Sequence, residues 1–304
     1  MAATNDRRLD ELIDLYEDAA IQLSDLLSEM TIEKGGENRR AIYLLTAALL
    51  ANVRSSTEDW LETTAREIFE EGDEQAVELL ATLGLDDFGF PDIDTEIDNI
   101  VNEYGGTLFD ALASVQNLSQ QVRRGDISSD FLSLSSRNAL VAGTMGVAGI
   151  AALKSNLAEN FRKSAVSILG TNGRIYRFSL DYYAGIVSNR MKYDALSRAS
   201  ILRTLSAGQD LVQVSPNAST IGDYCDLYKG KVFSISGMHP MYPPLSSIPN
   251  GGCPMHPNCH HTLLPYVGEG DTGFLPDEFL ALAEQGITNP NDFQAAFEDF
   301  EGED

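Results

Sequence analysis

The stretch CDLYKGKVFSISGMHPMYPPLSSIPNGGCPMHPNCHHTLLPY, residues 225–266, decides how the C-terminal part of the chain folds. Residues 231–236 alternate apolar and polar side chains, as expected of a β-strand. The residues that follow are rich in proline and glycine, which block helices and sheets and hold an irregular loop open. We therefore expect a small α+β module whose loop has little apolar content with which to fix its own shape.

All four histidines and all three cysteines of the chain lie within residues 225–261. Thiolate and imidazole groups are ligands of tetrahedral Zn²⁺, and a bound metal would supply the cross-link that this loop lacks. The odd number of cysteines disfavours a disulfide framework. We predict a structural zinc site, and the favoured ligands are Cys225, His256, Cys259 and His261. The alternates are His239, Cys253 and His260.

Two metal-free interpretations stay open: a Cys253–Cys259 disulfide, and buried thiols packed with hydrogen-bonded histidines. A catalytic zinc site needs an open coordination position and a nearby carboxylate base, and only Asp223 and Asp226 lie close in sequence. The chain has no HExxH motif, phosphate-binding loop or nucleophile elbow. We expect no enzyme, with a metal-dependent hydrolase or nuclease as the alternative.

Helical patterns dominate the chain before this module. Residues 9–30 carry one apolar stripe at three- and four-residue spacing, and Gly35 and Gly36 end it. We predict further helices at 39–53, at 57–71 with Thr57 as N-cap, at 74–83 ending at Gly84, and at 97–122 with a break at Gly105-Gly106. The remaining predictions are a loop at 86–94, strands at 174–178 and 211–214, a long helix at 180–205, and short helices at 276–285 and 291–300.

These elements predict a mainly α fold in which a helical N-terminal region precedes a small α+β C-terminal module with a Cys/His-rich loop. The predicted division is an acidic helical bundle or docking region (1–130), a Gly/Ala-rich helical connector (131–171), the α+β module (172–268), and short helices with an acidic tail (269–304). The uncharged run 138–153 is too short to span a bilayer, which takes about 20 residues, so we expect no stable membrane insertion.

The charge of the chain is strongly negative but unevenly distributed. The formal net charge is −25, and lysine is scarce. Self-repulsion of this size is tolerated where salt screens it, which favours a halophilic host over an ordinary acidic protein. Residues 131–203 alone are positive, by +7. We expect internal ion pairs there, and a phosphate backbone or the acidic surface of another subunit is the other predicted contact.

Five segments together resemble the C-terminal part of the MuF-like head morphogenesis family, the minor capsid proteins of tailed phages. They are GRIYRFSLDYYAGIVSNR (173–190), GQDLVQVS (208–215), CDLYKGKVFSISG (225–237), YPPL (242–245) and HPNCHHTLLPY (256–266). The resemblance covers under a third of the chain, and HPNCxH followed by PY is its most specific part. This chain departs from the family pattern in having no histidine after Ser215 and in having His260 in place of arginine.

The resemblance implies a virion protein that is assembled in the host cytoplasm and located in the capsid interior or at the portal vertex. It implies a role in head assembly and in genome packaging or delivery. The implied partners are the portal and the major capsid protein, with several copies of the chain in each virion. It also marks Cys225, His256, Cys259 and His261 as signature positions of the family.

Overall fold

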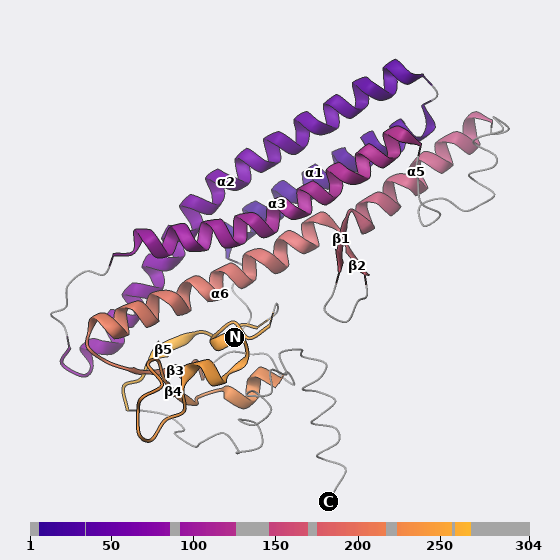
Figure 1. Cartoon of the computed structure of the whole chain (residues 1–304). Coiled ribbons are helices and arrows are strands. Elements are labelled where there is room, and N and C mark those ends of the chain that lie inside the picture. Colours follow the sequence, from indigo (N-terminus) through magenta and orange to yellow (C-terminus); the bar gives the residue numbers. More distant parts are fainter. Residues whose placement is uncertain are drawn as a thin grey trace, which may run out of the picture. The chain divides into compact units, whose positions relative to one another are not determined.

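The computed structural model describes residues 6–33, 35–85, 92–125, 146–169, 175–216, 224–256 and 259–268. The chain is mainly helical, with small antiparallel sheets in its second half (Figure 1), which confirms the predicted fold class. The chain separates into two compact units. Unit 1 holds Glu62–Val101 and Asn189–Asp304 with Met1–Thr4, and unit 2 holds Asn5–Leu61 and Asn102–Ser188. The predicted four-region division stays a prediction, and the helices expected at 276–285 and 291–300 lie outside the described residues.

Helix α1 (Arg7–Ile32) confirms the first predicted helix and belongs to unit 2. The Asp6 side chain caps its first turn by accepting a hydrogen bond from the backbone N–H of Arg8. Its apolar stripe faces helix α5 (Val147–Ser164), and together they form part of a buried cluster. The cluster contains Leu27, Met30, Ile42, Val122, Leu153, Leu157 and Phe161.

Helix α2 runs without interruption over Gly36–Ala81, so the prediction of three separate helices was wrong. Thr57 lies inside this helix and does not act as an N-cap. Its hydroxyl donates to the carbonyl oxygen of Val53 at 2.7 Å and lies 3.2 Å from the hydroxyl of Tyr16 on α1. These contacts satisfy a buried threonine without ending the helix. Beyond Ala81 the chain turns at Gly84, whose φ is +71°, as the sequence predicted.

Helix α3 (Asp94–Arg124) also runs through a predicted break, because Gly105 and Gly106 are ordinary helical positions in it. A Cβ on Gly105 would lie 3.3 Å from Leu61, which shows that this glycine permits close packing.

Helix α6 (Leu180–Ser206) confirms the long helix predicted at 180–205. The loop predicted at 86–94 lies largely outside the described residues, which resume at Asp92.

Gly72, in the middle of α2, lies against the backbone of α6. A Cβ there would stand 2.9 Å from Leu196 Cα, closer than real Cβ contacts come. It would also stand 3.0 Å from Ala199 Cβ, which is a tight contact. We expect Gly72→Ala to destabilise the protein by about 1–3 kcal/mol, because the helices must separate. Gly106→Ala is the matched control. Nothing lies within 4 Å of its Cβ position, so it should stabilise the chain by about 0.5–1 kcal/mol. Urea denaturation measures both, and a stabilising Gly72→Ala would contradict this packing.

Two strands form a hairpin between α5 and α6. Strand β1 (Val166–Leu169) pairs antiparallel with β2 (Ile175–Phe178), with Val166 opposite Phe178. The sequence predicted β2 but not β1. Ile175 and Tyr176 are exposed on β2, and the ring of Phe178 stacks on Tyr182 and Tyr183 of α6.

The second sheet consists of β3 (Leu211–Val214), β4 (Val232–Ser234) and β5 (Leu263–Pro265), in the order β4-β3-β5 with antiparallel pairing throughout. The strands predicted at 211–214 and 231–236 are thereby confirmed, the second in shortened form. We call residues 211–266 the C-terminal module. It lies in unit 1, and the backbone N–H of Leu263 donates to Ser197 Oγ of α6 at 3.1 Å.

Part of the positive block is paired with carboxylates of the chain itself, which supports the internal ion pairs that we expected. Such pairs among the described residues include Lys154 with Glu29, Lys163 with Glu159, Arg198 with Asp194 and Glu96, and Arg203 with Asp73. A contact of this region with DNA stays a prediction. Among the described residues, no helix is long and apolar enough to cross a membrane.

Candidate metal centre

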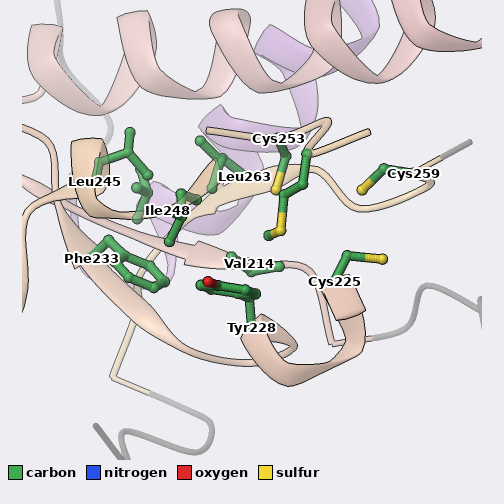
Figure 2. Packing of buried hydrophobic residues seen from close by; sticks show 11 residues of the cluster. Val214, Cys225, Tyr228, Phe233, Leu245, Ile248, Cys253, Cys259 and Leu263 are labelled. Atoms are coloured by element: carbon green, nitrogen blue, oxygen red, sulfur yellow. The ribbon is translucent and has the colours of Figure 1, made fainter. Parts of the chain in front are cut away.

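The candidate site lies at one edge of the apolar core of the C-terminal module. This core joins the three strands to the proline-rich loop, and Figure 2 shows its side chains. Its buried members are Val212, Val214, Cys225, Tyr228, Phe233, Leu245, Ile248, Cys253, Met255, Cys259 and Leu263. In Figure 2 the side chains of Cys225 and Cys259 lie at the margin of the cluster, while Cys253 lies among the apolar residues.

Cys225 is held by a short 3₁₀ helix, η1 (Tyr224–Tyr228), that precedes β4. The turn after η1 is fixed to β3 because Gly230, with a φ of +74°, donates its N–H to the carbonyl oxygen of Val214. The side chain of Gln213 binds the carbonyl oxygen of Gly230 at 2.7 Å. These bonds place Cys225 against the sheet with none of its surface exposed.

The proline-rich loop supplies the other side of the site. It contains the short 3₁₀ helices η2 (Leu245–Ser247) and η3 (Pro249–Gly251) and a cis peptide bond before Pro254. The side chain of Asn250 donates to the carbonyl oxygen of Met255 at 2.6 Å, and Cys259 donates its N–H to the carbonyl oxygen of His256 at 2.9 Å. The second bond joins the backbones of the two residues whose ligand atoms lie close together.

Three of the four predicted ligands form one buried group. The ligand atoms of Cys225, His256 and Cys259 all lie within 4.8 Å of one another, with His256 Nε2 3.1 Å from Cys225 Sγ. In a tetrahedral zinc site with bonds of about 2.0–2.3 Å, neighbouring ligand atoms are about 3.3–3.8 Å apart. The group could therefore hold a metal ion after small side-chain movements.

The fourth predicted ligand, His261, reaches only part of this group. Its Nδ1 atom lies 3.7 Å from Cys259 Sγ, a separation suited to two ligands of one ion. However, His261 is not a member of the group that Cys225, His256 and Cys259 form. Its imidazole must move towards Cys225 and His256 before four protein groups can bind one ion.

Cys259 is prepared for metal binding by its surroundings. Hydrogen bonds lower the pKa of its thiol to about 4, the strongest of them from Cys225 and another from His261, although burial opposes the shift. This lowering of the pKa favours the thiolate of Cys259, the form that binds metals. Cys253 is different, because burial above all, and then the nearby charge of Cys259, raise its pKa well above the ordinary value. It is a neutral thiol within the apolar core.

The remaining candidates have other roles in the structure. All three cysteines are free thiols, so the Cys253–Cys259 disulfide is excluded. The His260 ring stacks on Tyr193 of α6, with ring centres 5.1 Å apart. His239 packs on the Tyr242 ring and accepts a hydrogen bond at Nδ1 from the backbone of Met241. The sequence predicted these three residues as alternate ligands, because the spacings of the seven residues do not fix a single set.

Asp226 lies at the site in a role that its residue type did not indicate. The sequence offers it as a candidate catalytic base, whereas its Oδ1 lies 3.9 Å from Nε2 of the buried His261. Its position directly after Cys225 was the available signal. The turn of η1, which directs both side chains towards the same loop, could not be read from the sequence.

Comparison of the chain with protein-family models, with curated protein sequences and with solved structures finds no match. The geometry of the buried Cys225–His256–Cys259 group alone indicates a site that could hold a metal ion.

Proposed function

We propose that this chain is a minor capsid protein of a tailed virus, located in the capsid interior or at the portal vertex. The proposal rests on one observation: residues at signature positions of the family lie close together in the fold. Cys225, His256 and Cys259 are 31 and 3 positions apart in sequence and form one buried group, with His261 in contact with Cys259. The helical remainder of the chain supplies the surface that docks on the portal or the major capsid protein.

Within this function the Cys/His group binds a structural zinc ion that holds the C-terminal module together. Burial supports a structural role, because Cys225, His256, Cys259 and His261 are each less than 10 % exposed. A hydrolytic centre keeps one coordination position open to water and substrate, whereas a structural site is closed by four protein ligands. The hydrolase or nuclease alternative therefore has less support.

Zinc content tests the metal centre directly. We expect elemental analysis of the purified chain to find one zinc ion per molecule, and X-ray absorption to show sulfur and nitrogen ligands without bound water. A folded, protease-resistant module that contains no metal would overturn the zinc assignment. Three protein ligands with a water molecule would favour the hydrolytic alternative.

The location in the virion is tested on purified particles. We expect mass spectrometry of gradient-purified virions to detect the chain in several copies, fewer than those of the major capsid protein. We also expect reconstruction of the portal vertex to place it on the portal or the inner capsid wall, where residues 131–203 are available to packaged DNA. Absence of the chain from purified particles, with its presence in the infected-cell lysate, would overturn the proposal.

The halophilic host that we infer predicts a dependence of stability on salt. The net charge of −25 should lower the free energy of unfolding in dilute buffer through repulsion between carboxylates. We expect the Tm to rise steadily as KCl increases from about 0.1 M to about 3 M, because the Debye length falls to about 3 Å near 1 M. Circular dichroism at matched pH measures this rise, and a Tm independent of KCl would remove the halophilic inference.

A further inference from the structure

The two ring nitrogens of His261 face two different partners. Nδ1 lies 3.7 Å from Cys259 Sγ, and Nε2 lies 3.9 Å from Asp226 Oδ1. The His261 side chain is fully buried, and its Nε2 atom has no hydrogen-bond partner among the described residues. Buried polar nitrogens are nearly always paired, so the unpaired Nε2 requires a physical reason.

We propose that Asp226 is a positioning residue, which accepts the N–H of His261 Nε2 and so presents Nδ1 as the fourth ligand of the metal. This inference rests on the metal centre proposed above and extends it to a closed set of four protein ligands. The Asp226 carboxylate binds no metal itself, because it faces Nε2 of His261, whereas Nδ1 of that ring faces Cys259.

Tautomer chemistry links the two contacts of the ring. A neutral imidazole carries a proton on one nitrogen and a lone pair on the other. If Nδ1 binds the metal, the proton must lie on Nε2, inside the protein, where water cannot accept it. A carboxylate or carbonyl oxygen that receives this proton fixes the tautomer and the ring orientation in most metal sites with histidine.

The position of Asp226 is suited to this role. It follows Cys225 on η1, so the segment that supplies one metal ligand also orients another. The separation of 3.9 Å is longer than a hydrogen bond, and a shift of less than about 1 Å would close it. The Asp226 side chain is 30 % exposed, whereas the His261 side chain is fully buried.

The test compares metal affinity in full-length variants. We expect Asp226→Ala to weaken Zn²⁺ binding about 10- to 100-fold in a chelator competition assay. Asp226→Asn should fall between this variant and the wild type, because the amide oxygen still accepts the Nε2 hydrogen. Glu78→Ala is the matched control, since it removes one exposed carboxylate from α2 and should leave the affinity unchanged.

A double-mutant cycle separates positioning from general structural support. His261→Ala should itself weaken binding and alter the d–d bands of the Co²⁺-substituted protein, as one tetrahedral ligand is lost. In the His261→Ala background, Asp226→Ala should cause no further loss, because its effect passes through that ring. An equal loss in both backgrounds would overturn the inference.

The outcomes distinguish this inference from the proposed metal centre. Absence of metal from the wild-type protein would remove both. Tight zinc binding by the wild type and by Asp226→Ala alike would overturn the role of Asp226 and leave the metal centre in place. Near-ultraviolet circular dichroism of each variant, recorded with saturating Zn²⁺, identifies any variant that fails to fold.

Discussion

Cys259→Ser is expected to unfold the C-terminal module while the helices of unit 2 stay folded. A serine hydroxyl remains protonated at neutral pH and does not replace a thiolate as a zinc ligand. Structural zinc sites contribute apparent binding free energies of about 10–16 kcal/mol, and this energy is used for folding. Hydrogen exchange should therefore show loss of protection in β3, β4 and β5. Protection in α1 and α5, which pack in a separate cluster, should be kept.

Cys253→Ala is the matched control for this prediction. Cys253 is buried in the same core but is not in the metal-binding group. Its replacement should keep the zinc and cost about 1–2 kcal/mol through lost packing. A chelator added to the wild-type chain should reproduce the exchange pattern of Cys259→Ser. An intact module in both the serine variant and the chelated protein would contradict a metal that stabilises the fold.

Strong periodic patterns in the sequence were enough to predict the fold class. The stripe on residues 9–30 and the apolar spacing of 180–205 gave α1 and α6 nearly to their ends. The breaks expected near Thr57 and at Gly105 were wrong for a common reason. Threonine is common at the first residue of a helix and glycine weakens a helix interior, but here tertiary packing decides: Thr57 bonds to Val53 O beside Tyr16, and Gly105 lies against Leu61. Contacts across 41 or 44 positions are not visible in a local window.

The site was predictable in composition but not in detail. Clustering of all cysteines and histidines indicated where a metal could bind, and three of the four favoured residues do form one group. The exclusion of Cys253 depends on its side chain lying in the apolar core. The separate contacts of His239 and His260 depend on aromatic rings at Tyr242 and Tyr193. Such orientations follow from the packed module and not from spacing.

The second prediction with a large effect concerns a buried ion pair in unit 1. Arg203 of α6 binds Asp73 of α2 through two bonds, Nε to Oδ1 at 2.6 Å and Nη2 to Oδ2 at 2.5 Å. The two residues are 3 % and 8 % exposed. Arg203→Ala should lower the free energy of unfolding by about 3–5 kcal/mol, because the Asp73 carboxylate remains buried without its partner. Urea denaturation at fixed high salt measures this loss.

Two further variants show whether the cost comes from the unpaired charge or from loss of a favourable bond. Arg198→Ala, which breaks more exposed pairs with Asp194 and Glu96, should cost about 0–1 kcal/mol. The double variant Asp73→Leu with Arg203→Met should restore most of the stability or exceed it, because apolar side chains of similar volume need no partner. If Arg203→Ala cost no more than Arg198→Ala, water would have to reach Asp73 and the pair would not be buried. If the double variant were as unstable as Arg203→Ala, the ion pair itself would be holding α2 to α6 within unit 1.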